Sequence, residues 1–179
     1  MNNLAFVVQK HRATALHYDF RLEIGGIMPS WSIPKGPTLD NKVKRLAMRT
    51  DDHDLEYRHF EGVTPGGKYG IGIVMIWDEG TYWPETEAEK GVFHEVTDIS
   101  EAQKIAGKSL RDGILKFRLH GKKLQGSFAL VKTKGMGGMN SWLLIKHRDE
   151  FCKEGYNAKD CDSSAVSGLS LEEIARSKR

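Results

Sequence analysis

Three side chains near the amino terminus have the residue types and the spacing of a metal site. His17 and Asp19 are separated by one residue, and His11 precedes them on the same stretch of chain. Two imidazoles and a carboxylate suit a divalent transition metal such as Mn²⁺, Zn²⁺ or Fe²⁺. Arg21 follows Asp19 at the same spacing, and a guanidinium pairs well with phosphate oxygens. The cluster therefore predicts a metal ion that holds a phosphate group.

The element that positions this cluster has the periodicity of a β-strand. Within residues 15–24, apolar side chains alternate with the polar set His17, Asp19, Arg21 and Glu23. Because successive strand side chains point to opposite faces, the polar set should share one face above an apolar row. A strand with one polar face is common in ordinary sheets, so the His-x-Asp pair alone is weak evidence. The addition of His11 and Arg21 strengthens the interpretation.

The remaining chain predicts a mainly β protein. Short β-rich runs bounded by Gly, Pro or Asp occur at residues 4–9, 15–24, 27–33, 45–50, 71–77, 114–119, 124–132 and 142–147. This spacing indicates an antiparallel barrel or sandwich, and we expect a small antiparallel β-barrel with a few short helices. Gly25-Gly26 predicts a hairpin turn. Helices are expected over 100–110, with Ser100 at the start, and over 169–178, with a Ser170-x-x-Glu173 capping box.

Length and composition limit the classes of protein that the chain can form. With 179 residues, we expect one domain spanning 1–179. No run approaches the roughly 20 apolar residues of a membrane span, and the amino terminus lacks the pattern of a signal peptide. Cys152 and Cys161 lack the spacing of a zinc knuckle or a disulfide framework, so free thiols are expected. These features favour a soluble intracellular protein.

Charge is strongly segregated along the chain. Residues 1–50 carry 8 Lys/Arg against 3 Asp/Glu, residues 51–100 carry 3 against 12, and residues 101–150 carry 11 against 4. If the first and third segments pack together, they form a basic face that attracts a nucleic-acid backbone. A solvated surface of mixed charge is the alternative interpretation.

Further candidates for the site lie downstream of the histidine strand. The irregular loop 34–37 gives Lys35 the reach to contact a ligand. If the strands around 15–24 and 45–50 are close, His53 and Tyr57 face the row of His17, and His53 can donate a proton to a leaving oxygen. His53 alone, among acidic residues, is typical of a surface histidine. The Gly-rich segment 65–72 fits no phosphate-binding fingerprint and is interpreted as a structural turn.

The sequence contains a series of recognisable stretches, which in chain order are FVVQKH at 6–11, LHYDFRLE at 16–23, SWSIPKGP at 30–37, KRLA at 44–47, DH at 52–53, LEY at 55–57, FEG at 60–62, the PxGxYG turn at 65–70 and WLLIK at 142–146. With these stretches the sequence resembles a known family, the 3′-phosphoesterase domain of bacterial DNA ligase D and its free-standing bacterial and archaeal relatives. The resemblance covers nearly the whole chain.

The resemblance implies a Mn²⁺-dependent enzyme that trims DNA 3′ ends during break repair, with Zn²⁺ or Co²⁺ as other metals that it could use. Such enzymes remove a 3′-terminal ribonucleoside from a primer strand, leaving a 3′-phosphate, and then remove that phosphate to leave a 3′-hydroxyl. It also implies a small β-barrel with a groove at its mouth, a separate DNA ligase and polymerase as partners, and a cytoplasmic, nucleoid-associated location without membrane contact.

The resemblance also implies roles for particular residues. It assigns His11, His17 and Asp19 to the metal, and Arg21, Lys35 and Arg45 to the phosphate or its flanking backbone; Gln9, His53 and Tyr57 complete the site. Gly66 and Lys68 stand where the family often has acidic residues, and Asp54 stands where a proline is common. None of these three departures falls on an expected ligand.

Two other functions remain open on the sequence. The His17-x-Asp19 pair with a distant histidine imitates the triad of non-haem Fe²⁺ oxygenases, although this interpretation leaves the clustered basic residues without a role. The basic segments also allow a non-catalytic module that grips DNA ends. That module predicts that alanine at His11, His17 or Asp19 leaves function intact.

Overall fold

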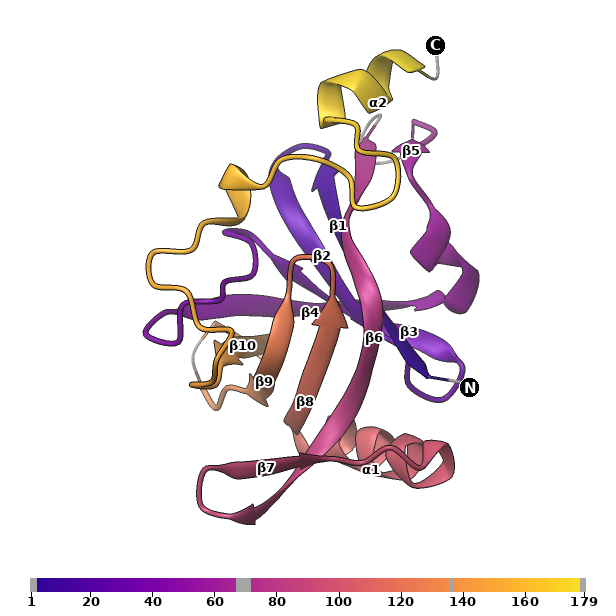
Figure 1. Ribbon diagram of the computed structural model, residues 1–179. Helices are drawn as coiled ribbons and strands as arrows, with labels where there is room; N and C mark the ends of the chain where they lie inside the picture. The colour runs from indigo at the N-terminus through magenta and orange to yellow at the C-terminus, as the bar shows by residue number, and fades with distance from the viewer. Residues whose placement is uncertain (1–2, 67–71, 136, 178–179) are drawn as a thin grey trace.

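The computed structural model describes residues 3–66, 72–135 and 137–177 (Figure 1). The strands are β1 (Leu4–Arg12), β2 (Leu16–Leu22), β3 (Ile27–Ile33), β4 (Lys44–Asp54), β5 (Gly62–Val63), β6 (Ile73–Glu89), β7 (Val92–Glu95), β8 (Ile114–Gly121), β9 (Gln125–Lys132) and β10 (Ser141–Lys146). The helices are α1 (Ile99–Asp112) and α2 (Leu171–Ser177), with short 3₁₀ turns η1 (Leu55–His59) and η2 (Ala158–Asp160).

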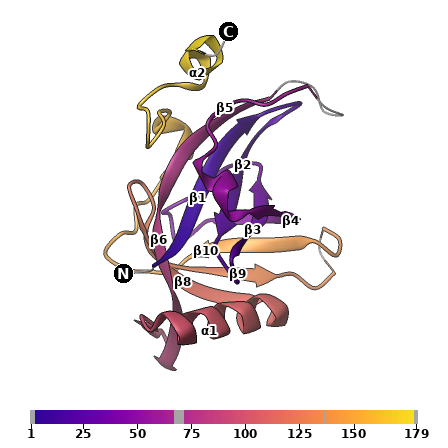
Figure 2. The same ribbon diagram turned by 90° about the vertical axis from the view of Figure 1, so that its right-hand side faces the viewer.

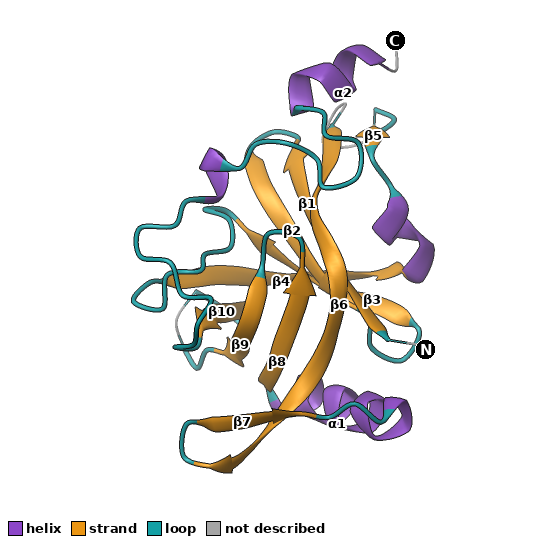
Figure 3. Ribbon diagram, in the orientation of Figure 1, coloured by secondary structure: helices purple, strands orange, loops and turns teal. Residues whose placement is uncertain are grey.

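The strands form one antiparallel sheet that closes on itself. The order runs β1-β2-β3-β4-β10-β9-β8-β6, and β6 pairs in turn with β1. A closed ladder has no free edge along this ring, so its backbone donors and acceptors are paired between neighbours. Figure 3 shows the strands at the centre and the helices at the periphery. The mainly β, antiparallel fold expected from the sequence is confirmed.

The hydrophobic core fills the inside of this ring. Inward side chains alternate with outward ones, and those of β2, namely Tyr18, Phe20 and Leu22, are buried as the sequence alternation predicts. Trp31, Trp77 and Trp142 join the same core. Trp83 is partly buried and packs against the same core.

A second, smaller apolar cluster lies on the outer face. Val7, Met28 and Ile76 are buried there, and Leu55 of η1 packs against them. η1 is therefore held against the outside of the sheet, where it covers part of the polar face of β1 and β2. This cover explains how outward-facing polar side chains become buried.

The two helices lie at opposite ends of the ring (Figure 2). α1 packs Ala102 and Ala106 against the core, and its N-cap is Asp98, whose carboxylate accepts a hydrogen bond from the Glu101 N–H. The helix thus begins at Ile99, one residue before the expected start at Ser100, because Asp98 supplies the cap. In α2, Ser170 and Glu173 exchange the reciprocal hydrogen bonds of the expected capping box.

The largest difference between the strands and the sequence pattern is in β6. β6 continues for 17 residues to Glu89 and then pairs with β7, whereas the pattern ended near residue 77. The missed part is rich in glutamate, which lowers strand propensity. Its pairing is instead supported by contacts such as that between Lys116 and Glu87.

The β2–β3 hairpin sets the register of the polar face. Gly25 and Gly26 have φ values of 64° and 80°, and a two-residue turn of this kind requires positive φ at both positions. The expected turn is confirmed. Its geometry places Arg21 opposite Ser30.

A bulge between β3 and β4 controls where His53 points. Ser30 pairs with Thr50 but Met28 pairs with His53, so β4 has one extra residue opposite Pro29. Proline has no N–H to donate, which makes a bulge a suitable place for it. Because one extra residue reverses the alternation, His53 shares the outer face with Thr50.

The turn between β8 and β9 depends on a buried carboxylate. Asp78 is fully buried, and its oxygens accept hydrogen bonds from the N–H groups of Lys122, Lys123 and Leu124 at 2.8–3.0 Å. Asp78→Ala leaves these three donors without their acceptor, and we expect a loss of about 3 kcal/mol in the free energy of unfolding. Urea denaturation of the purified variant measures this loss, and a change below about 1 kcal/mol would contradict the anchoring role.

Two expectations about the chain as a whole can be compared with the described residues. Cys152 and Cys161 are both free thiols, as expected. Across residues 3–66, 72–135 and 137–177, no helix has the length and apolar character to cross a membrane. Lys68 and residues 67–71 of the Gly-rich turn lie outside the described residues.

Candidate metal and phosphate site

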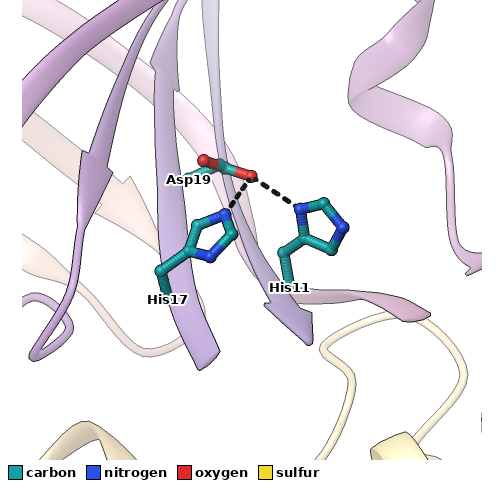
Figure 4. Close-up of side chains that lie close together, drawn as sticks. All are labelled: His11, His17 and Asp19. Carbon is teal, nitrogen blue, oxygen red and sulfur yellow. Dashed lines mark ion pairs between the residues drawn. The ribbon is translucent and has the colours of Figure 1, made fainter. Parts of the chain in front are cut away.

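The three predicted metal ligands meet on the outer face of β1 and β2. His11 and His17 are paired across the two strands, and Asp19 follows two positions further along β2. Oδ2 of Asp19 lies 3.5 Å from Nδ1 of His11 and 3.4 Å from Nε2 of His17 (Figure 4). The turn 13–15 is short enough to bring the two imidazoles to a centroid distance of 4.8 Å.

The donor set fits a divalent transition metal. The three ligand atoms lie within 4.8 Å of one another. Ligands bound at about 2.1 Å around one tetrahedral ion are about 3.4 Å apart, close to the two distances from the Asp19 carboxylate. One ion can therefore be reached by all three side chains with little movement.

The protein fixes the orientation of the His17 ring. Its Nδ1–H donates to the carbonyl oxygen of Ala15 at 3.1 Å, which leaves Nε2 as the unprotonated nitrogen facing Asp19. A hydrogen bond of this kind selects the ligating nitrogen of a metal-bound histidine.

Arg21 contacts several of the other polar side chains on this face. Nε donates to Oε1 of Gln9 at 2.7 Å, and Nη1 donates to Oγ of Ser30 at 2.8 Å. Nη2 lies 3.4 Å from the Asp19 carboxylate. A guanidinium has five N–H donors, so Nη2 keeps a donor for a ligand beside the metal ligands.

Gln9 lies behind Arg21 and does not line the cavity. Its side chain is fully buried, and Nε2 donates to the carbonyl oxygens of Tyr57 and Phe60 at 2.9 and 3.0 Å. The Gln9 amide thus links β1, Arg21 and η1.

His53 and Tyr57 lie beside Arg21, as the sequence analysis expected. His53 Nδ1 is 3.1 Å from Arg21 Nη1 and 3.0 Å from the carbonyl oxygen of Asp51. The Tyr57 ring packs 4.9 Å from the His53 ring and 5.2 Å from the Arg21 guanidinium carbon. Tyr57 therefore restricts both groups to the face of the metal ligands.

A cavity of about 510 Å³ joins these groups. Its lining residues are His11, Ala13, Thr14, Ala15, His17, Asp19, Arg21, Thr50, His53 and Tyr57. Sequence reasoning missed Thr50 and the turn residues 13–15. Thr50 could have been found only from the bulge, because strict alternation does not place it and His53 on one face.

The chain matches the family described as the DNA Ligase D 3′-phosphoesterase domain over residues 9–132. The chain belongs to this family. The matched range contains every site residue expected from the sequence, from Gln9 to Tyr57.

The relatives of this chain are much longer proteins, and the match covers only a part of each. The chain is 42% identical over 146 residues to the "multifunctional non-homologous end joining protein LigD" of Pseudomonas aeruginosa, covering 82% of this chain and 15% of that protein. It is 42% identical over 145 residues to the LigD of Mycobacterium tuberculosis, covering 81% and 16%. The Mycolicibacterium smegmatis protein is 38% identical over 149 residues, covering 83% and 18%. The chain thus spans less than a fifth of each relative.

Two further residues that the resemblance assigns to the phosphate or its backbone line a different cavity. Lys35 and Arg45 line a second cavity of about 480 Å³, together with Pro34, Asp40, Val43, Gly155, Tyr156, Asn157 and Lys159. Nε of Arg45 is buried and has no hydrogen-bond partner among the residues that the structure describes. The structure thus groups His53 and Tyr57 with the metal ligands, and it groups Lys35 with Arg45.

Burial and charge shift the pKa values of the groups in this candidate site. Burial raises the pKa of Asp19, but contacts with His11 and His17 and the charge of Arg21 outweigh it and hold that pKa well below its usual value. The hydrogen bond to Asp19 raises the pKa of His17 above 6.5. Burial and the charge of Arg21 lower the pKa of His53. Asp19 is therefore ionised and His53 neutral near pH 7.

The raised pKa of His17 predicts a pH dependence for metal binding. A ligating imidazole must lose its proton, so the metal competes with a proton once the pH falls below the pKa of His17. We expect the apparent Mn²⁺ affinity to fall by about tenfold per pH unit below this point and to level off above it. Titration calorimetry between pH 5.5 and 8 measures this, and an affinity independent of pH would contradict it.

Proposed function

We propose that this chain is a metal-dependent phosphoesterase that heals DNA 3′ ends in break repair. It removes 3′-terminal ribonucleosides as a phosphodiesterase and 3′-phosphates as a phosphomonoesterase, leaving a 3′-hydroxyl. The observation that carries the proposal is the convergence of His11, His17 and Asp19 within 4.8 Å, next to Arg21 and His53, in a chain of the DNA ligase D 3′-phosphoesterase family.

His11, His17 and Asp19 would hold the metal, which we propose to be Mn²⁺, with Zn²⁺ or Co²⁺ as alternatives. A bound divalent ion supplies Lewis-acid polarisation of a phosphoryl oxygen. The carboxylate of Asp19 remains ionised for this role because of the charges around it.

Arg21 binds the phosphate and stabilises the charge that develops on its oxygens. Its Nε and Nη1 groups are held by Gln9 and Ser30, so the guanidinium is oriented before the substrate arrives. Such preorganised donors stabilise a transition state without a cost of reorientation. The buried amide of Gln9 has a positioning role in this arrangement.

His53 is our candidate for proton transfer to the leaving oxygen, or for a hydrogen bond to a non-bridging oxygen. Its lowered pKa keeps it neutral near pH 7 in the free site, so it can donate a hydrogen bond as it stands, whereas proton transfer requires the negative phosphate to raise its pKa first. Its ring lines the cavity with the metal ligands, and Tyr57 orients it or hydrogen-bonds a phosphate oxygen. On a ribonucleotide end, we propose that a water molecule attacks the phosphorus and that the bond from phosphorus to the 5′-oxygen of the terminal ribonucleoside breaks. That oxygen leaves with a proton, and the phosphate stays on the 3′-oxygen of the primer.

Lys35 and Arg45 bind the phosphate or the flanking backbone in our proposal. Because they line a separate cavity, we assign them to the backbone beyond the reacting group. Their positive charges would neutralise phosphates of the strand and make binding depend on salt.

The biological partners follow from the family. The LigD relatives are named as multifunctional end-joining proteins, so we propose that this chain acts on primer–template 3′ ends together with a DNA ligase and a polymerase. A cytoplasmic, nucleoid-associated location and a single-domain organisation over residues 1–179 belong to the same proposal.

A labelled primer–template tests the function directly. One substrate ends in a single ribonucleotide and the other in a 3′-phosphate, and each is incubated with the protein and Mn²⁺. We expect a product shortened by one nucleoside from the first and loss of phosphate from the second, resolved by gel mobility. Binding of both substrates without either product would instead support a non-catalytic DNA-end module.

A further inference from the structure

A glycine lies beneath the imidazole of His11. Gly72 precedes β6 on the same outer face, diagonal to His11 across the β1–β6 pair, in which His11 is opposite Val74. A Cβ atom at Gly72 would lie 2.6 Å from Nε2 and 3.3 Å from Cδ2 of His11. Real Cβ contacts are essentially never this short, so the ring occupies the space that a side chain would need.

The conformation of Gly72 does not itself require glycine. Its φ is outside the left-handed region, and any residue can adopt such a backbone conformation. The absence of a side chain is therefore explained by the neighbouring ring rather than by the backbone.

Thr64 holds Gly72 in place under the ring. The Gly72 N–H donates to Oγ1 of Thr64 at 2.8 Å, and the Thr64 N–H donates to the Gly72 carbonyl oxygen at 2.8 Å. Oγ1 of Thr64 also lies 2.9 Å from the position of the absent Cβ. The backbone at Gly72 is thus fixed on one side, and it cannot retreat from the ring without loss of these bonds.

We propose that Gly72, held by Thr64, is a positioning residue for His11. The His11 ring lies against Gly72, a contact surface that we call the seat, and this contact directs Nδ1 of His11 toward Asp19 and the metal. The ring is confined between this seat and the His17 ring, whose centroid is 4.8 Å away. Because Nε2 of His11 faces the seat, Nδ1 is the nitrogen of His11 that remains free to bind the metal. The inference rests on the proposed metal site and adds to it the feature that selects the ligating nitrogen of His11.

Substitution of Gly72 tests the seat through metal affinity. In Gly72→Ala the new methyl group displaces the far end of the His11 ring, and we expect Mn²⁺ affinity to fall by about 10- to 100-fold, as for other groups that orient a metal ligand. The midpoint of thermal unfolding without metal should change little, since a side chain rather than the backbone moves. Titration calorimetry with Mn²⁺ alone gives the affinity.

A double-mutant cycle separates positioning from a general structural effect. In a His11→Ala background the ring is absent, so Gly72→Ala should cause no further loss of Mn²⁺ affinity. Gly107→Ala is the matched control, because a Cβ at that helical glycine meets nothing closer than 3.6 Å. Thr64→Ser should keep wild-type affinity, whereas Thr64→Val should lose part of it.

The outcomes distinguish this inference from the proposed function. Wild-type affinity in Gly72→Ala, or an equal loss with and without His11, would overturn the seat while leaving the metal site intact. A wild-type protein that binds no divalent metal would overturn the proposed function and the seat with it. A loss that depends on His11 supports both.

Discussion

Replacement of Asp19 by asparagine is expected to abolish metal-dependent hydrolysis of a DNA 3′-phosphate. The side chain keeps its shape, but the anionic oxygen that faces His11, His17 and Arg21 at 3.4–3.5 Å becomes neutral. Metal polarisation of a phosphoryl oxygen contributes several kcal/mol to catalysis, which corresponds to a loss of about 10³-fold or more in rate. Phosphate release from a 3′-phosphate primer under saturating Mn²⁺ measures it.

A control for Asp19→Asn is available on the opposite face of β1. Asp162 forms an ion pair with Lys10, the neighbour of His11, but is not one of the metal ligands. Asp162→Asn should therefore retain nearly full activity and Mn²⁺ affinity. Comparable losses in both variants would show that the effect at Asp19 arises from general destabilisation, and full activity of Asp19→Asn would refute its role as a ligand.

Replacement of Arg21 by lysine should separate phosphate binding from metal binding. The guanidinium contacts Gln9, Ser30 and Asp19 at the same time, and an ammonium group cannot reproduce this fork. Loss of one preorganised donor to a phosphoryl oxygen costs about 10²- to 10³-fold in rate. We therefore expect this loss in single-turnover rate, while Mn²⁺ affinity remains within about tenfold of the wild type.

Arg118→Lys provides a matched comparison for Arg21→Lys. Arg118 also pairs with a buried carboxylate, that of Glu85, but it lines a different cavity. Its conversion to lysine should leave the single-turnover rate unchanged. If Arg21→Lys instead lowers Mn²⁺ affinity as strongly as the rate, Arg21 acts mainly on the metal ligands and its assignment to phosphate is wrong.

Much of the site is encoded in local patterns that a sequence reveals. Strict alternation along β2 places His17, Asp19 and Arg21 on one face, and the short turn after His11 pairs it with His17. Both features depend on neighbouring residues alone. The prediction that these side chains converge is therefore confirmed, while their roles in catalysis stay predictions.

The rest of the site depends on contacts between distant segments. His53 reaches Arg21 because a bulge opposite Pro29 reverses the alternation of β4. No periodicity in residues 44–54 encodes that reversal. Lys35 and Arg45 illustrate the converse, since their cavity is completed by residues 155–159, whose position depends on how the carboxy-terminal segment packs. The contact between Gly72 and His11 could not be predicted from the sequence either, because only the folded structure places Gly72 under His11.

We propose that His11, His17 and Asp19 bind one catalytic metal ion, and anomalous diffraction from crystals soaked in Mn²⁺ shows whether they do. We expect one strong peak at about 2.0–2.2 Å from His11 Nδ1, His17 Nε2 and an oxygen of Asp19. If the protein hydrolyses a 3′-phosphate with Mn²⁺ but the peak lies elsewhere, or none lies between these side chains, the proposed metal site is wrong.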